Sequence, residues 1–366
     1  HIPFCRQACH YCDFHFSTNT SRKEEMVQAL CREIAAQKNY LGGAPLKTIY
    51  LGGGTPSLLS ATELEAIFKA IHAYHKVAAG AEITLEANPE DLSLEYCQMI
   101  ASKDINRLSI GIQSFQEKNL QLMNRNHNAD DSVQAIKNAQ NAGIYNISID
   151  LIYGIPSNSS DELQTDLDIA TSFGVPHISA YSLTIEPKTV FGLQKKKGDF
   201  VEIPDSAMVS AFQQVRDYLE SKGYEGYETS NFAKDGQYSV HNTSYWQQEP
   251  YLGVGPSAHS FNGHSRQWNV SNNSKYLKEG HVKAEKEYLS PANQLNEYLM
   301  VRFRTKWGID LSFVRKSFQQ LDQPYPEKEF QDWINKGFAH LDGNNLILKG
   351  EGKLIADRLS SDIFVV

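Results

Sequence analysis

The chain opens with His1-Ile-Pro-Phe-Cys5-Arg-Gln-Ala-Cys9-His-Tyr-Cys12-Asp-Phe-His-Phe16. The three cysteines have the spacing C-x3-C-x2-C, so a short loop can wrap their sulfurs around one small inorganic group. Thiolates prefer soft metals, which leaves zinc or an iron–sulfur cluster. A structural zinc needs a fourth ligand, and His10 is the only candidate nearby. We therefore expect this loop to bind metal and the rest of the fold to be organised around it.

Length and charge narrow the class of protein. The chain has 366 residues, which suits one large domain and a smaller one. Its net charge of 35 − 43 = −8 argues against nucleic acid as the main partner, because phosphate binding needs clustered Lys and Arg. No apolar run approaches the ~18 residues of a membrane span, and no signal-peptide pattern is present. These features are compatible with peripheral contact with a membrane.

Cysteine usage indicates the compartment. The five cysteines are an odd set with three in one loop, which is no disulfide framework. A reducing cytoplasm is the natural location for such a protein. Cys31 and Cys97 lie in helical patterns, and we expect them to be small core residues rather than ligands. The chain begins with His1 rather than Met, so we expect its true start to lie upstream.

Strand-like and helix-like segments alternate up to about residue 225, with Ser60 as a predicted N-cap. The predicted strands are 2–4, 48–51, 82–87, 107–112, 147–152 and 178–183, and the predicted helices are 22–38, 61–75, 94–103, 131–142, 162–173 and 204–222. Repeated βα units with apolar strands indicate parallel pairing with helices outside. We predict an α/β fold, an incomplete parallel (β/α)6 barrel over residues 1–225, with its chemistry at the carboxyl ends of the strands.

The rest of the chain divides into two parts. Residues 226–289 are rich in aromatics, Asn, Gly and Ser, and we expect an extended or looping segment across the barrel mouth. Residues 290–366 resemble a small winged-helix-like α+β domain, with helices at 311–320 and 327–336 and a hairpin turn at 342–345. The second of these helices mixes Glu, Lys and Asp instead of presenting a basic face, which argues against a role in DNA binding.

Polar residues and glycines follow several predicted strands. Gly52-Gly53-Gly54-Thr55 ends the second strand, and glycine lets the backbone take positive φ and approach a ligand closely. A polar side chain that ends an apolar strand either caps the strand or binds a ligand. The other candidates are Glu86, Gln113, Arg125 and Asp150.

The cysteine spacing is the signature of the radical SAM enzymes, and the chain resembles them. In that family three thiolates hold three irons of a [4Fe–4S] cluster, and S-adenosylmethionine (SAM) chelates the fourth iron. The resemblance implies that Cys5, Cys9 and Cys12 are the cluster ligands. Nearly the whole chain is similar to the oxygen-independent coproporphyrinogen oxidase branch of the family. That similarity implies SAM contacts from Tyr11, Gly53, Gly54, Thr55, Glu86, Gln113, Arg125 and Asp150, with Tyr11 beside the adenine.

One further motif is typical of the heme chaperones of this branch. His241-Asn-Thr-Ser-Tyr245-Trp246 matches their HNxxYW pattern. A neutral imidazole can ligate heme iron, and Tyr245 and Trp246 offer flat apolar surface to a porphyrin. The resemblance implies a protein that binds heme through His241 and delivers it to heme-accepting proteins. His259 and His264 are the alternative ligands. The simplest alternative is that His241 binds no heme and only caps a turn.

The runner-up function is an enzyme, the oxygen-independent coproporphyrinogen III oxidase (dehydrogenase) of porphyrin biosynthesis. That oxidase has a further cysteine two residues after the third ligand, whereas this chain reads Cys12-Asp13-Phe14. It would decarboxylate coproporphyrinogen III to protoporphyrinogen IX. A zinc-stabilised binding module is the third interpretation, and it requires the absence of iron.

Replacing Cys5, Cys9 or Cys12 with Ser should abolish the broad visible absorption of the anaerobically reconstituted protein, since each thiolate is expected to hold one iron. Cys31→Ser and Cys97→Ser are the matched controls and should leave the spectrum intact. Full iron loading of the triple Cys→Ser variant would contradict the cluster assignment.

Overall fold

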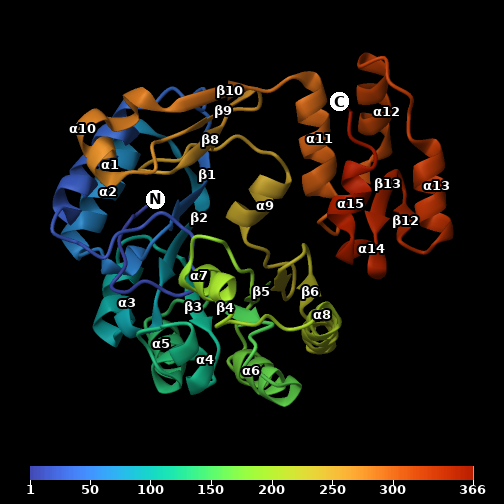
Figure 1. Ribbon diagram of the computed structural model, residues 1–366. Coiled ribbons are helices and arrows are strands. Elements are labelled where there is room, and N and C mark those ends of the chain that lie inside the picture. The colour runs from blue at the N-terminus through green and yellow to red at the C-terminus, as the bar shows by residue number, and fades with distance from the viewer. Residues whose placement is uncertain (366) are drawn as a thin grey trace.

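A computed structural model describes residues 1–365, apart from the side chains of residues 282 and 283. Its centre is a seven-stranded sheet in the order β1-β2-β3-β4-β5-β7-β6 (Figure 1). These strands are β1 Leu46–Leu51, β2 Val77–Ala87, β3 Arg107–Gln113, β4 Ile147–Tyr153, β5 His177–Ser182, β6 Glu225–Gly226 and β7 Asn231–Ala233.

The first five strands pair in parallel, as the βα pattern predicted. The predicted strand at residues 2–4 makes only isolated bridges, and Ile2 pairs in parallel with Gly53 beyond β1. At the other edge β7 runs antiparallel to β5, and β6 runs antiparallel to β7. This antiparallel edge was not predicted, because strands of two or three residues are too short to show a periodic pattern.

Helices cover one side of the sheet, where α3, α4, α5, α6 and α8 lie along the lower part of Figure 1. The helices of this region are α1 Lys23–Ala36, α2 Ala61–Tyr74, α3 Leu94–Ala101, α4 Glu117–Leu122, α5 Ala129–Asn141, α6 Ser160–Ser172, α7 Val190–Lys197 and α8 Asp205–Ser221. Ser60 caps α2 as predicted, in a reciprocal capping box with Glu63. The short helices α4 and α7 were missed.

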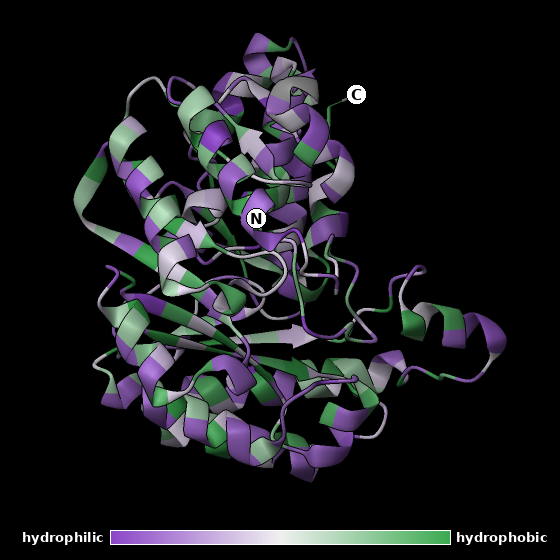
Figure 2. Ribbon diagram, turned by 90° about the vertical axis from the view of Figure 1, so that its left-hand side faces the viewer, coloured by the Kyte–Doolittle hydropathy of each residue, from purple (hydrophilic) through white to green (hydrophobic). Residues whose placement is uncertain are grey.

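The main hydrophobic core lies between the strands and these helices. Leu108, Ile110, Ile147, Ile149 and Ile178 have no exposed surface. Figure 2 shows the central strands mostly in green, the hydrophobic end of the scale, while the helices alternate green with purple. The alternation is expected of helices that bury one face against a sheet.

Cys97 is fully buried and Cys31 packs partly against the same core, so both predictions are confirmed. No helix within residues 1–365 is long and apolar enough to cross a membrane.

The middle segment corrects our prediction of an extended or looping region. The HNxxYW motif lies on a helix, α9 Val240–Trp246, which contacts β1. After it come a three-stranded antiparallel sheet in the order β10-β9-β8 and a further helix. Their bounds are β8 His259–Phe261, β9 Ser265–Trp268, α10 Asn273–Glu279 and β10 Glu285–Tyr288. The periodicity was weak because each element is short, and a helix of seven residues needs tertiary contacts to form.

The C-terminal part has the predicted winged-helix order and a core of its own, around Leu299, Phe303 and Trp333. Its helices α11 to α15 stand together on the right of Figure 1. Their bounds are α11 Pro291–Arg302, β11 Ile309–Asp310, α12 Leu311–Gln320, α13 Glu327–Asn335, β12 Ala339–Asp342, β13 Asn345–Leu348, α14 Glu351–Leu354 and α15 Ala356–Ser361. The three strands form an antiparallel sheet in the order β11-β13-β12.

Glu33 on α1 ties the middle segment to the barrel. It is only 1% exposed and accepts hydrogen bonds from Gly255 N (2.8 Å), Asn269 Nδ2 (2.7 Å) and Tyr276 Oη (2.5 Å). Three donors from a distant part of the chain therefore share one buried carboxylate.

Glu33→Ala should lower the free energy of unfolding by on the order of 3 kcal/mol, because it leaves buried donors without an acceptor. The exposed Glu24 on the same helix is the matched control, and Glu24→Ala should change it by less than about 0.5 kcal/mol. Urea unfolding followed by circular dichroism makes the comparison. Equal midpoints for the two variants would show that this carboxylate does not hold the segment.

Candidate functional site

The cysteine loop is held against the carboxyl end of β1 by backbone pairing. Ile2 N donates to Gly52 O (2.8 Å), Gly54 N to Ile2 O (2.9 Å), and Thr55 N to Phe4 O (2.7 Å). A methyl group on Gly54 would lie 2.7 Å from the carbonyl oxygens of both Ile2 and Phe4, so only glycine permits this approach. The glycine motif and the cysteine loop therefore form one structural unit.

The far side of the loop is fixed by the turn that follows α4. Gln7 Nε2 donates to Asn124 O (2.9 Å), and Asn124 Nδ2 donates to Ala8 O (2.8 Å). His10 N donates to Met123 O (3.0 Å). The backbone between Cys5 and Cys12 is thus pre-shaped by contacts that do not use the sulfurs.

The three thiols are free and half-buried. Burial raises the pKa of Cys5 to about 11, and the neighbouring sulfurs of Cys12 and Cys9 add to that effect. Burial also raises the pKa of Cys12. Clustered thiolates in such a place need a positive charge to balance them, and a cluster of iron ions supplies it. The donor set fits a cluster.

The zinc alternative needs four ligands that converge on one ion. Within residues 1–365, no three His, Cys, Asp or Glu side chains are grouped so as to hold a single metal ion. His10 instead contacts the Leu122 carbonyl through Nδ1 (3.0 Å).

Arg125 connects the loop with the neighbouring strand ends. Its Nη1 lies 3.4 Å from both Cys9 Sγ and Tyr11 Oη. Its Nη2 donates to Gly111 O (2.7 Å) and Asn88 Oδ1 (2.8 Å). Although burial opposes it, the nearby Tyr11 and Cys9 raise the pKa of Arg125, so the guanidinium stays charged.

Gln113 belongs to the same group. It ends β3 with a positive φ of 71°, at a point where the pairing with β4 shifts register. A methyl group on Gly111 would meet Gln113 Nε2 at 2.8 Å and Arg125 Nη2 at 3.4 Å, so both side chains converge over Gly111. Thr55 joins through Asn88 Nδ2, which donates to Thr55 Oγ1 (3.4 Å). Asn88 was not among our predicted site residues.

Glu86 and Asp150 are the two carboxylates of this region. Glu86 accepts hydrogen bonds from Tyr50 Oη (2.7 Å) and Gly53 N (3.0 Å). Burial raises the pKa of Glu86, while these two bonds lower it in part. Asp150 accepts from Ser109 Oγ at 3.0 and 3.2 Å, and burial raises its pKa too. The charge of Asp150 adds to the raised pKa of Glu86, and both carboxylates add to the raised pKa of Tyr50. The three side chains therefore lie in one electrostatic environment.

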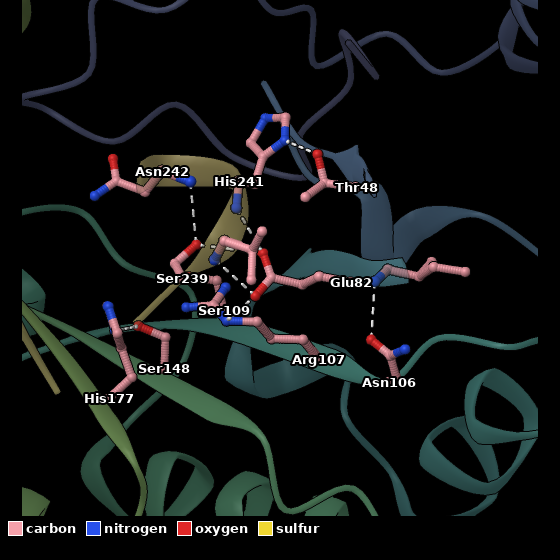
Figure 3. Close-up of polar contacts among 12 residues, drawn as sticks. Thr48, Glu82, Asn106, Arg107, Ser109, Ser148, His177, Ser239, His241 and Asn242 are labelled. Carbon is pink, nitrogen blue, oxygen red and sulfur yellow. Dashed lines mark hydrogen bonds and ion pairs between the residues drawn. The ribbon is translucent and has the colours of Figure 1, made fainter. Parts of the chain in front are cut away.

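Helix α9 is docked onto the barrel by a second buried glutamate, as Figure 3 shows. Glu82 on β2 accepts from the backbone N–H groups of Val240 (3.0 Å) and His241 (2.9 Å), at the first turn of the helix. Arg107 Nε lies 3.8 Å from the same carboxylate, and the two side chains are 4% and 7% exposed. The negative charge of Glu82 is favourable here, because a helix N-terminus carries partial positive charge and because Arg107 pairs with the same carboxylate.

The His241 ring is held on three sides. Its Nδ1 lies 2.8 Å from Thr48 Oγ1, and its Nε2 lies 2.9 Å from Tyr245 Oη. The ring stacks on Tyr50, with a centroid distance of 4.6 Å and an interplanar angle of 15°. Burial and the charge of Arg107 lower the pKa of His241 to about 4, so the imidazole is neutral at pH 7.

Asn242, the second residue of the HNxxYW motif, is connected to Asp150 by a series of side-chain contacts. Asn242 Nδ2 donates to Tyr227 Oη (3.2 Å), which lies 2.9 Å from His177 Nε2. His177 Nδ1 contacts Ser148 Oγ (2.7 Å), and Ser148 Oγ lies 3.4 Å from Asp150. His241 and Asn242 are therefore linked to Glu86 and Asp150 through side chains of the barrel interior.

A cavity of about 680 Å³ lies along the unpaired edge of β1. Much of its wall is apolar, with Leu30, Ile34, Ile67 and Ile71 among its lining residues. A free strand edge with an apolar wall is the kind of surface that a pairing strand covers. His241, Tyr245 and His259 also line it.

The two alternative heme ligands, His259 and His264, and a further histidine, His15, lie farther from this group of residues. His259 on β8 is exposed and stacks on Trp268 (5.9 Å, 22°). His264 is exposed in the turn between β8 and β9. His15 is half-buried and contacts Asn273 Oδ1 (2.7 Å) through Nε2.

Sequence reasoning missed the residues that dock α9. Thr48 and Tyr50 lie two residues apart on β1, and Glu82 and Glu86 lie four residues apart on β2. Residues at even spacing in a strand point to the same face, so each pair shares one face. Polar residues repeated on one face of a buried strand were the available signal.

Comparison with protein-family models matches residues 1–170 to the Radical SAM superfamily. The chain is 33% identical to the heme chaperone HemW of Bacillus subtilis, over 98% of this chain and 96% of that protein. It is 31% identical to the mitochondrial radical S-adenosyl methionine domain-containing protein 1 of Bos taurus, over 98% of this chain and 85% of that protein. The chain belongs to the radical SAM superfamily and, within it, to the HemW family.

A solved structure gives the same fold. Coproporphyrinogen III oxidase (HemN) from Escherichia coli, described as a radical SAM enzyme, matches 98% of this chain and 88% of its own with a TM-score of 0.83. At 20% identity this likeness concerns the fold alone. The predicted fold class is confirmed.

If Glu86 accepts hydrogen bonds from SAM, as the family resemblance implies, Glu86→Ala should weaken SAM binding by on the order of 1–3 kcal/mol. Gly53→Val should block binding, since Gly53 has a φ of 107° and a Cβ there would lie 2.7 Å from the His1 ring. Titration calorimetry on the reconstituted protein measures both. The exposed Glu95→Ala is the control, and wild-type affinity in all three variants would place the SAM pocket elsewhere.

Proposed function

We propose that this protein is a heme chaperone that binds a [4Fe–4S] cluster, SAM and heme, and delivers heme to recipient proteins in the cytoplasm. The observation that carries the proposal is the position of the HNxxYW helix. Its neutral His241 lies one side chain, Tyr50, away from Glu86. The names of the HemW relatives support the same function.

In this proposal Cys5, Cys9 and Cys12 hold the cluster. Tyr11, Gly53, Gly54, Thr55, Glu86, Gln113, Arg125 and Asp150 hold SAM. Radical SAM proteins use the reduced cluster and SAM as a source of the 5′-deoxyadenosyl radical. The chain's own part is to place charges around the ligand: the guanidinium of Arg125 suits a carboxylate, and the oxygens of Glu86 suit an ammonium group.

Heme is the cargo, and His241 is its proposed ligand. A ligating histidine must be neutral, and burial keeps His241 in that form at pH 7. Tyr245 is 42% exposed beside it and provides an aromatic surface that a flat ligand can cover. His259 lines the same cavity and is the next candidate.

The alternative function is the oxygen-independent coproporphyrinogen III oxidase reaction. The observation that favours it is that the residues implied to bind SAM remain together around the cysteine loop. Against it stand the sequence Cys12-Asp13-Phe14, which lacks the oxidase's further cysteine, and a histidine motif that decarboxylation does not require.

The purified protein should bind heme with a Soret band that His241→Ala shifts or weakens. His72→Ala replaces an exposed histidine on α2 and should leave the band unchanged, while His259→Ala and His264→Ala test the alternative ligands. An unchanged spectrum in His241→Ala would remove that ligand assignment.

The same protein, reduced and supplied with SAM, should form no protoporphyrinogen from coproporphyrinogen. Product analysis by chromatography after anaerobic incubation makes the measurement. Sustained multiple turnover would overturn the chaperone proposal in favour of the oxidase.

A further inference from the structure

The surroundings of His241 distinguish its two ring nitrogens. Thr48 Oγ1 lies 2.8 Å from Nδ1, and Tyr245 Oη lies 2.9 Å from Nε2. Thr48 comes from β1, in the sheet, whereas Tyr245 is the sixth residue of the same seven-residue helix. One contact therefore belongs to the rigid barrel and the other to an exposed side chain.

A tautomer follows from the chemistry of the two hydroxyls. If Nδ1 carries the proton, it donates to Thr48 Oγ1, and the lone pair of Nε2 accepts from the Tyr245 hydroxyl. Histidines that bind metals are commonly oriented by a hydrogen bond from the other ring nitrogen to a protein acceptor. Thr48 stands where such an acceptor belongs.

The backbone beneath the ring is equally constrained. Glu82 accepts from the N–H group of His241 itself (2.9 Å), and its carboxylate is paired with Arg107. Tyr50 covers one face of the ring and is itself fixed by its bond to Glu86 (2.7 Å). The ring plane, the position of its backbone and one nitrogen are thus all set by β1, β2 and β3. Figure 3 shows the contacts of His241 with Thr48 and Glu82.

The Nε2 atom of His241 is the ring nitrogen that a ligand could approach from the cavity. Tyr245 is 42% exposed, and both Tyr245 and His241 line the cavity beside β1. Rotation of Tyr245 would free the Nε2 lone pair without breaking any contact of His241 with the barrel. No other described side-chain hydrogen bond involves the Tyr245 hydroxyl.

We propose that Thr48 is a positioning residue that presents His241 Nε2 to the heme iron, and that the Tyr245 hydroxyl is the group the iron displaces. This inference rests on the proposed function, since it assumes that His241 ligates heme. It predicts effects of opposite sign for the two hydroxyls, which a merely structural role would not produce.

Thr48→Val keeps the shape and β-branching of the side chain but removes the acceptor. Heme affinity should fall about 10- to 100-fold, the usual effect of losing such an orienting partner, with a shifted Soret maximum. Thr48→Ser restores a hydroxyl and should recover most of the affinity. Thr84→Val is the matched control, because Thr84 faces Tyr50 in the sheet register and its buried hydroxyl has no partner within residues 1–365.

Tyr245→Phe keeps the aromatic ring and removes only the competing hydroxyl. Heme affinity should rise about 2- to 10-fold, as expected when a typical hydrogen bond no longer has to be broken. Spectrophotometric titration with heme, on protein whose cluster absorption and circular dichroism match the wild type, measures all of these variants.

The outcomes separate the inference from the function beneath it. Heme binding that is lost in His241→Ala but unchanged in Thr48→Val overturns the positioning role and leaves the chaperone proposal standing. Weaker binding in Tyr245→Phe overturns the displacement step. Heme binding that does not depend on His241 at all overturns both the proposed ligand and this inference.

Discussion

The close approach of two backbone segments underlies the candidate site. Ile2 to Phe4 pair with Gly52 to Thr55 through three hydrogen bonds of 2.7 to 2.9 Å. Because a Cβ on Gly54 would collide with the opposing carbonyls, the glycine motif is required for the cysteine loop to reach the strand ends. This pairing places the loop beside Thr55 and Glu86, and the contacts of the loop with Met123 and Asn124 place it beside Arg125.

A second constraint joins the HNxxYW helix to the same region. Glu82 and Glu86 are on one face of β2, and one docks the helix while the other contacts Gly53 and Tyr50. Tyr50 lies between Glu86 and His241. Tyr50 therefore contacts both a residue proposed for SAM, Glu86, and the residue proposed for heme, His241.

The shared fold does not choose between chaperone and enzyme. A barrel of this kind can host many activities, so the function must come from the residues of the site. Here the family relationship and the histidine motif both support the proposal that the ligand is heme. The sequence Cys12-Asp13-Phe14 lacks the oxidase's further cysteine, which also favours the chaperone over the oxidase.

The sequence determined much of the fold and the family, and the family implies the class of cofactor, because these depend on local patterns. The spacing of Cys5, Cys9 and Cys12 belongs to one loop, the parallel strands follow from repeated apolar βα units, and Ser60 begins its helix through a contact three residues away. Only the tertiary structure decided where the motif helix lies. Its contacts to Glu82 and Thr48 join residues 159 and 193 positions apart, and α9 is too short to form without them. A pattern read within a short window contains no information about such partners, so the surroundings of His241 emerged only when the chain was folded.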